Sequence, residues 1–155
     1  MAIRQQVPRE HIRRALQGAD RLRPFLLSNV TTTGRQLGGG SYGVVEELEM
    51  DGLVCAGKKI YDALIDPENQ GAQRMVDRYY SECSLLSELR HPHIVQFLGI
   101  CFLPDTQLPV LVMERLQGSL DELLETTPDI PLPTKLSVLQ DVARGLVFLH
   151  NRSPP

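Results

Sequence analysis

The stretch Leu37-Gly38-Gly39-Gly40-Ser41-Tyr42-Gly43 and the Asp51-Gly52 dipeptide that follows it decide the fold. Residues 44–50, between the two, have the β-prone composition of a strand, and Asp-Gly is a strong signal for a tight hairpin turn. Residues 53–60 then predict the returning strand, and residues 31–33 begin a strand before the glycines. The glycines are therefore expected in a loop between two antiparallel strands, with a third strand following.

Hydrophobic spacing predicts further elements after a loop at residues 61–70. A helix is expected over about 71–89, with Met75, Tyr79, Leu85, Leu86 and Leu89 as its main apolar positions. Next come two short strands at 94–102 and 110–113, joined by a turn. A capping box predicts a helix over 119 to about 126–128, and a last helix should start after Pro133, capped by Thr134.

Length and composition suit one globular domain, or one and a fraction. The chain has 155 residues, with 42% hydrophobic and 23% charged residues. No apolar run is long enough for a transmembrane helix, and no signal peptide is expected. Three cysteines without CxxC spacing predict neither a disulfide framework nor a zinc ribbon, so the simplest expectation is a reduced, cytoplasmic chain.

Charge is distributed unevenly along the chain. Residues 1–35 hold seven arginines against two acids, whereas residues 36–155 hold nine basic and seventeen acidic residues. The acidic body argues against nucleic-acid binding. Residues 1–30 are interpreted as a basic leader, a solvated helix or frayed arm. An arm for a membrane surface or an acidic partner, and a mitochondrial presequence interrupted by Glu10 and Asp20, are the alternatives.

The pattern Gly38-x-Gly40-x-x-Gly43 is a weak signal by itself. A Walker A loop would end in Gly-Lys-Ser/Thr, but Val44 follows Gly43. A Rossmann loop would open a helix and be followed about twenty residues on by an acid, but this loop opens a strand and Lys58 stands there. A loop that covers a nucleotide and an ordinary glycine hairpin remain.

Residues beyond the loop favour the nucleotide. The two-residue period of a strand puts Ala56 and Lys58 on one face and Lys59 on the other. A small residue beside a lysine can line an adenine site and reach its phosphates. Glu82, on the helix that follows, is the candidate carboxylate to hold the Lys58 ammonium.

Together these residues closely resemble the small lobe of a eukaryotic protein kinase over residues 31–155, with a leaning to the tyrosine-kinase-like serine/threonine group. The motifs that carry the resemblance are GxGxxGxV (Gly38, Gly40, Gly43, Val45), AxK (Ala56, Lys58), ExxxL (Glu82, Leu86), HPxIV (His91, Pro92, Ile94, Val95), Val112-Met113-Glu114 and Leu146-x-x-Leu149-His150.

The resemblance implies an α+β fold. An antiparallel five-stranded sheet with helix C would occupy residues 31–116 as small lobe and hinge. Residues 117–155 would begin the large lobe with helices D and E and leave it incomplete. The apolar stripe of the last helix has no obvious cover, so these residues are expected to dock loosely, aggregate or need a partner.

The resemblance also implies an ATP site, with Lys58 on the α- and β-phosphates and Glu82 paired with it as the catalytic residues. The ATP-binding residues would be Leu37, Gly38, Gly39, Gly40, Ser41, Tyr42, Gly43, Val45, Ala56, Lys58, Met113, Glu114 and Leu116. Met113 would be the gatekeeper, and backbone groups of Glu114 and Leu116 would bind the adenine edge. Gly57 departs from the family pattern, which has Ile, Val or Met there.

Two further interpretations concern single side chains. His91 and His93 with Cys83 and Cys101 could suggest a metal, but a structural role in a loop is favoured. Tyr79 and Tyr80 could be phosphorylation sites, but packing on the helix is favoured.

The family's HRDxxxxN and DFG motifs, which supply the catalytic Asp and the Mg²⁺ ligands, do not occur in the sequence. The chain alone is therefore expected to bind ATP without transferring phosphate to Ser, Thr or Tyr, and Mg²⁺ is expected only in a complete kinase. An incomplete copy of an active kinase, a short non-catalytic binding or scaffolding module, and a decayed reading frame are the alternatives. The protein substrate or partner kinase is not specified.

Overall fold

The computed structural model describes residues 20–65 and 71–152. Two compact units divide them: residues 20–65, 71–88 and 97–115 form the first, and residues 89–96 and 116–152 form the second. The helix predicted in the N-terminal leader and residues 66–70 of the loop predicted at 61–70 lie outside the described residues. Within the described ranges, no helix is both long and apolar enough to cross a membrane.

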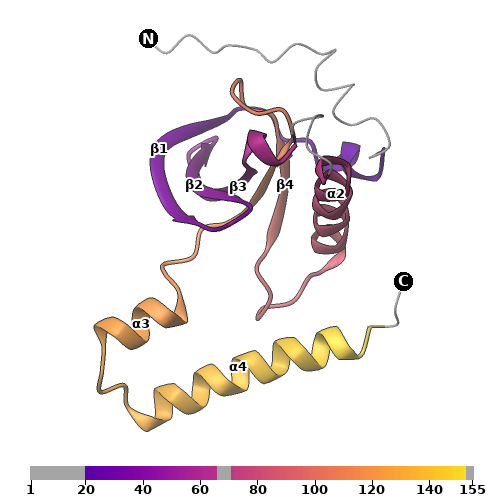
Figure 1. The fold of residues 1–155 in the computed structure, drawn as a ribbon. Helices are drawn as coiled ribbons and strands as arrows, with labels where there is room; N and C mark the ends of the chain where they lie inside the picture. The colour runs from indigo at the N-terminus through magenta and orange to yellow at the C-terminus, as the bar shows by residue number, and fades with distance from the viewer. Residues whose placement is uncertain (1–19, 66–70, 153–155) are drawn as a thin grey trace. The chain divides into compact units, whose positions relative to one another are not determined.

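The first unit contains one five-stranded sheet in which every neighbouring pair is antiparallel (Figure 1). Its strand order is β1-β2-β3-β5-β4. This confirms the predicted fold class. The strands are β1 (Val30–Gly39), β2 (Gly43–Met50), β3 (Leu53–Ile60), β4 (Phe97–Cys101) and β5 (Val110–Glu114). Strand β4 begins later than predicted, because residues 94–96 belong to the loop of the second unit.

The hairpin between β2 and β3 fixes the register of the sheet. Asp51 and Gly52 both have positive φ angles, 48° and 85°, as a two-residue type I′ turn requires. Pairing then runs without interruption from Met50 opposite Leu53 to Gly43 opposite Ile60. Because a slip of one residue would turn every side chain to the other face, this turn determines which residues of β3 face which core.

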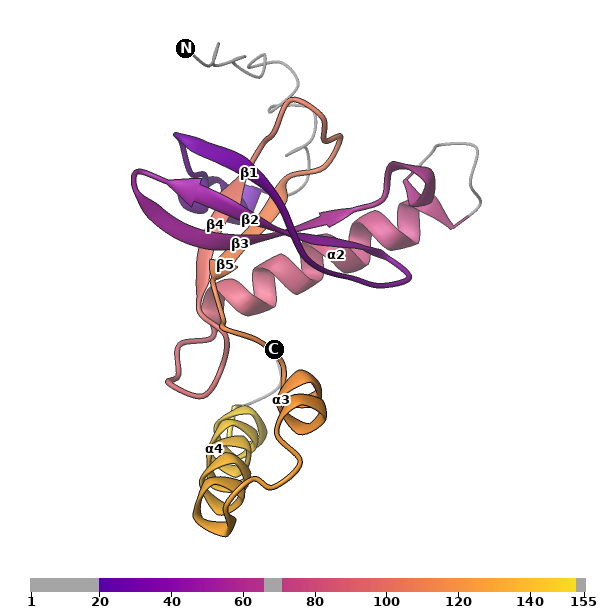
Figure 2. The same ribbon diagram turned by 90° about the vertical axis from the view of Figure 1, so that its left-hand side faces the viewer.

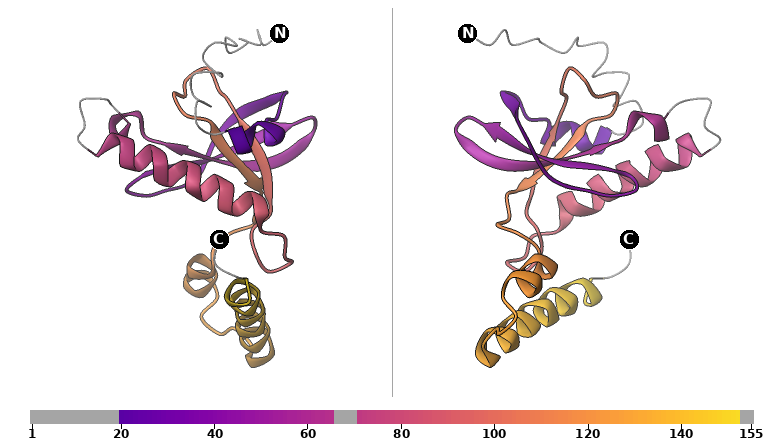
Figure 3. Two further views of the ribbon diagram at one scale, coloured as in Figure 1. Left: turned by 90° about the vertical axis from the view of Figure 1, so that its right-hand side faces the viewer. Right: turned by 60° about the vertical axis from the view of Figure 1, so that its left-hand side comes forward.

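Helix α2 (Ala72–Glu88) lies along one side of the sheet and contacts β4 (Figures 2 and 3). Tyr79 and Cys83 are its buried residues toward the sheet, one helical turn apart. Leu85, one of the main apolar positions expected on this helix, is 53% exposed. Cys83 is the buried residue in that part of the helix.

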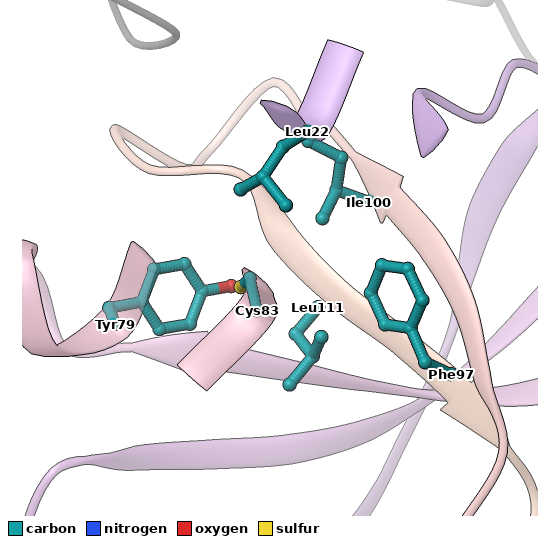
Figure 4. Packing of buried hydrophobic residues seen from close by; sticks show 6 residues of the cluster. All are labelled: Leu22, Tyr79, Cys83, Phe97, Ile100 and Leu111. Carbon is teal, nitrogen blue, oxygen red and sulfur yellow. The ribbon is translucent and has the colours of Figure 1, made fainter. Parts of the chain in front are cut away.

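Two apolar cores lie on opposite sides of the central strands. Leu111 faces one core, whereas its neighbours Val110 and Val112 face the other, as the alternation of a strand requires. Figure 4 shows the core between α2 and the sheet, with its buried residues Leu22, Tyr79, Cys83, Phe97, Ile100 and Leu111. The second core is formed by Leu48, Cys55, Cys101, Leu103, Val110 and Val112.

A segment that the sequence assigned to the basic leader contributes to the first core. The short 3-10 helix η1 (Asp20–Phe25) buries Leu22 to 2% exposure, and the Phe25 ring meets Phe97 edge-on at 5.4 Å. The Leu27 N–H donates to the Ile100 carbonyl at 2.8 Å. Arginines dominate the composition of residues 1–35 and hide these apolar positions. A second short helix, η2 (Asp62–Leu64), follows β3.

The second unit contains α3 (Leu120–Thr126) and α4 (Leu132–His150). The predicted cap of α3 is confirmed, because the Glu122 N–H donates to Ser119 Oγ at 3.1 Å. Helix α4 begins before the predicted start after Pro133. Proline is compatible with the first turn of a helix, so Pro133 lies inside it and Pro131, not Thr134, is the N-cap.

One side of α4 packs on the loop 89–96. The His91 ring stacks on Phe148 at 4.7 Å, and His93 Nδ1 lies 3.5 Å from the Asp141 carboxylate. A Cβ at Gly145 would lie 2.9 Å from the His93 carbonyl oxygen, so this contact requires glycine. Many apolar residues of the unit are exposed: Leu120, Leu123, Leu124, Leu132, Leu136, Leu139, Val142, Leu146, Val147 and Leu149.

Gly57 provides a test of the packing on the second core. A Cβ there would lie 2.3 Å from Leu48 Cδ1 and 2.9 Å from Val110 Cγ1. We expect Gly57→Val, which restores a residue typical of the family, to lower the free energy of unfolding by about 1–3 kcal/mol through overpacking. Urea unfolding measures it, with Gly40→Ala as control, since a Cβ at Gly40 meets nothing within 4 Å. An unchanged midpoint for Gly57→Val would contradict the packing.

The three cysteines are free and buried, and burial raises the pKa of Cys83 and of Cys101 to about 12. Their thiols are thus protonated at pH 8, and we expect the folded chain to react with iodoacetamide only as fast as it unfolds. These folded pKa values exceed the unfolded value of 9.0. The contribution of the two protonated thiols to the free energy of unfolding is therefore complete below about pH 9, and it is lost as the pH rises toward 12. Mass spectrometry measures the labelling, and rapid labelling of Cys83 without denaturant would contradict its burial.

Candidate functional site

Lys58 and Glu82 form an ion pair between β3 and α2. The Lys58 Nζ lies 2.5 Å from Glu82 Oε1, although the two residues are 24 positions apart in the sequence. Their side chains are 32% and 40% exposed, so the ammonium is oriented by the carboxylate and still reachable from solvent. The structure therefore brings together the two residues that the sequence singled out for a phosphate site.

Strand register aligns this pair with the glycine-rich segment. Gly38 of β1 lies opposite Val45 of β2, and Val45 lies opposite Lys58 of β3. On the same face of β3, Ala56 lies opposite Met113 of β5. Ala56 is buried, whereas Val45 and Met113 are half-buried. The face that carries Lys58 thus carries three of the apolar residues predicted to contact adenine or guard its pocket.

The loop between β1 and β2 is closed by a hydrogen bond from the Gly40 N–H to the Gly43 carbonyl at 3.0 Å. Gly43 is required by the fold itself, because a Cβ there would lie 1.9 Å from the Lys59 carbonyl oxygen. Gly38 and Gly40 differ, since a Cβ at either would meet nothing within 4 Å. Packing explains one glycine of the motif and leaves two without a packing reason.

The remaining predicted site residues have varied environments. Leu37 and Glu114 are half-buried, whereas Gly39, Ser41 and Tyr42 are exposed on the loop. Leu116 is 52% exposed and belongs to the second unit. The first unit therefore holds every predicted site residue except Leu116.

Lys59 has the opposite environment to its neighbour. It is only 8% exposed, and its Nζ lies 2.8 Å from Glu46 Oε2 and 3.3 Å from Asp105 Oδ2. Burial by itself would lower the pKa of Lys59, but the hydrogen bonds and charges of Glu46 and Asp105 outweigh it and raise the pKa. Lys59 is thus a structural cation that ties β3 to β2 and to the β4–β5 loop, whereas the side chain of Lys58 is 32% exposed.

Tyr79 has a role that the sequence did not indicate. The expectation that it packs on the helix holds, because it is 2% exposed. In addition, its hydroxyl donates to the Pro109 carbonyl, just before β5. Burial raises the pKa of Tyr79 well above the ordinary tyrosine value. A tyrosine in a helical apolar stripe gives no sign in sequence of where its hydroxyl will find an acceptor.

No group of three or more His, Cys, Asp or Glu side chains suited to a metal ion occurs among residues 20–65 and 71–152. His91 and His93 have ring centroids 5.4 Å apart, in the second unit. Cys83 and Cys101 lie in the cores of the first unit. Each histidine has a packing or ionic partner on α4, which agrees with the structural interpretation.

Comparison with known proteins supports the resemblance to the protein kinase family. A family model described as protein tyrosine and serine/threonine kinase matches residues 31–154. The chain belongs to the protein kinase family. The match begins one residue after the start of β1 and includes the glycine-rich loop, Lys58 and Glu82.

Several relatives of the chain are named as serine/threonine kinases. A probable serine/threonine-protein kinase of Dictyostelium discoideum is 32% identical over 123 residues, which is 78% of the chain and 11% of that protein. CTR1 of Arabidopsis thaliana is 32% identical over 157 residues, covering 99% of the chain and 18% of CTR1. Human TNNI3K is 32% identical over 120 residues, covering 77% of the chain and 14% of TNNI3K. The chain thus spans less than a fifth of each.

The buried Lys59 cluster generates a stability prediction. We expect Lys59→Met to lower the free energy of unfolding by about 2 kcal/mol, because it leaves Glu46 and Asp105 without their shared cation. Since the pKa of folded Lys59 is raised, this difference should be complete below about pH 10.5 and shrink above it. Chemical denaturation at pH 7 and pH 11 measures both effects. Lys135→Met, at an exposed lysine, is the matched control, and equal stability of the two variants would contradict the assigned role.

Proposed function

We propose that the first unit binds ATP, as the nucleotide-binding part of a protein kinase that transfers the γ-phosphate to Ser or Thr hydroxyls of proteins. The observation that carries the proposal is the Lys58–Glu82 ion pair, half-exposed and in strand register with the glycine-rich loop. An oriented ammonium is a strong partner for phosphate oxygens. In this proposal residues 31–116 are the small lobe and hinge, and residues 117–155 begin the large lobe.

The glycine-rich loop supplies the second part of the phosphate site. Gly38 and Gly40 have open space where a side chain would stand, so backbone N–H groups there can approach a phosphate closely. The exposure of Ser41 and Tyr42 at the loop tip is consistent with a loop that lies over a ligand. Triphosphate charge and the Lys58 ammonium are complementary.

Apolar residues on the Lys58 face supply the adenine site. Leu37, Val45 and Ala56 would pack on the ring, and Met113 would limit the pocket behind it. Backbone groups of Glu114 and Leu116 would hydrogen-bond the edge of the base. Bound ATP supplies the phosphoryl group, and this chain's residues bind and orient it.

Transfer of the γ-phosphate requires residues beyond those that bind ATP. The sequence lacks the HRDxxxxN and DFG motifs that hold Mg²⁺ and orient the substrate hydroxyl in this family. We therefore propose that residues 1–155 alone bind ATP but do not transfer phosphate. The serine/threonine preference is inferred from the names of the relatives, and a cytoplasmic location from the sequence.

A non-catalytic binding or scaffolding module is the second candidate function. It is favoured by the exposed apolar side chains of α3 and α4, such as Leu139 at 64% and Leu132 at 66% exposure. Large exposed apolar surfaces of this kind mark interaction sites. Binding of ATP distinguishes the two candidates, because a scaffold needs none.

The decisive measurement is the affinity of the purified chain for ATP, with and without Mg²⁺, by calorimetry. Charged hydrogen bonds contribute about 1.5–3 kcal/mol, so Lys58→Ala should weaken binding by about ten- to a hundredfold. Lys135→Ala removes the same charge from an exposed position in the second unit and should leave the affinity unchanged.

Two outcomes count against the proposal. A folded wild-type chain that does not bind millimolar ATP favours the scaffold instead. Equal losses in Lys58→Ala and Lys135→Ala would mean that only net charge attracts the nucleotide. Transfer of radiolabelled phosphate by residues 1–155 to a generic protein substrate would refute the claim that the chain binds without catalysing.

A further inference from the structure

Tyr79 and Glu82 reach the same residue of β3 from one face of α2. Glu82 meets the Lys58 side chain at 2.5 Å. Three residues earlier, the Tyr79 hydroxyl lies 3.5 Å from the Lys58 backbone carbonyl and donates to the carbonyl of the buried Pro109. Residues three apart on a helix are neighbours on its surface, so one turn of α2 spans both the backbone and the ammonium of Lys58.

We propose that Tyr79 is a positioning residue for the phosphate site: its hydroxyl fixes α2 on the sheet at the place where the Glu82 carboxylate meets the Lys58 ammonium. The inference deepens the proposed function and rests on it for the meaning of the ion pair. Tyr79 touches no nucleotide and acts through Glu82.

The ion pair by itself is a weak tether for the helix. Both of its side chains are about one third exposed or more, and ion pairs in contact with water contribute little to stability. Apolar packing under α2 favours burial but is not directional, so it permits the helix to slide or rotate. A buried hydrogen bond is directional, and the Tyr79 bond lies one turn from Glu82.

The environment of the Tyr79 hydroxyl favours a stable hydrogen bond to the Pro109 carbonyl. Tyr79 is 2% exposed, within the core between α2 and the sheet, and Figure 4 shows its oxygen directed at the Cys83 sulfur. Burial keeps the pKa of Tyr79 well above its ordinary value, so the hydroxyl retains its proton for donation. Pro109 precedes β5 by one residue, and Leu111 of β5 pairs with Lys58. The acceptor is thus held beside the lysine by the sheet.

The test separates positioning from packing with a double-mutant cycle. Tyr79→Phe removes the hydroxyl and keeps the ring, and it is made alone and together with Glu82→Gln. Tyr80→Phe is the matched control, because it deletes the same group from the next residue on the helix. Two readouts are taken: the Kd for ATP, and the acetylation rate of Lys58 relative to the exposed Lys135 in the chain without nucleotide, by mass spectrometry.

We expect Tyr79→Phe to raise the Kd for ATP and the relative acetylation of Lys58 by about five- to tenfold, as the loss of one buried hydrogen bond implies. In the Glu82→Gln background the same change should add nothing, because the contact that the hydroxyl positions is already lost. Tyr80→Phe should leave both readouts unchanged. Replacing Tyr79 with 4-aminophenylalanine, which keeps a donor at the same place, should restore wild-type values.

Additive effects of Tyr79→Phe and Glu82→Gln would overturn the inference, since a residue that only packs acts independently of Glu82. Unchanged acetylation of Lys58 in folded Tyr79→Phe would do the same. The acetylation cycle needs no ATP, so it decides the role of Tyr79 even if the wild-type chain binds no nucleotide and the proposed function fails. If Tyr79→Phe does not fold, a folded 4-aminophenylalanine variant with increased Lys58 acetylation also overturns the inference.

Discussion

The two-residue period of β3 is the constraint on which the rest of the first unit depends. Cys55, Gly57 and Lys59 point to one side of the sheet, and Ala56 and Lys58 point to the other. The Asp51-Gly52 turn fixes that assignment, because it admits only one register between β2 and β3. The adjacent residues Lys58 and Lys59 consequently have different environments. Lys59 is buried between two acids, whereas Lys58 is reachable from solvent.

Packing on both faces of β3 keeps Lys58 and Lys59 in their different environments. On one face, the second core packs around Leu48 and Val110, and Lys59 on that face is held by Glu46 and Asp105. On the other, α2 covers Leu111 and supplies the carboxylate for Lys58. The site is therefore made by contact between a strand and a helix that are distant in sequence, and its geometry depends on how firmly the helix is held.

Local signals in the sequence predicted the elements of the first unit, because turn chemistry and alternation act over a few residues, whereas the pairing of Lys58 with Glu82 was implied by the resemblance to the kinase family. Three features escaped prediction for physical reasons. Leu22 is buried by tertiary packing inside a stretch whose charge suggests solvent. Leu85, an apolar position of the expected helix, is exposed, whereas Cys83 is buried. The acceptor of the Tyr79 hydroxyl lies 30 residues away, where no periodicity reaches.

The absence of a side chain at Gly57 has a consequence for its neighbour. A Cβ at that position would overlap Leu48, so the two positions share one volume in the second core, and the leucine fills the part that a branched residue would otherwise occupy. The identities of residues 48 and 57 are therefore not independent variables. In this chain, a valine at position 57 would require Leu48 to move or to be replaced by a smaller residue, so the effects of substitutions at the two positions should be coupled.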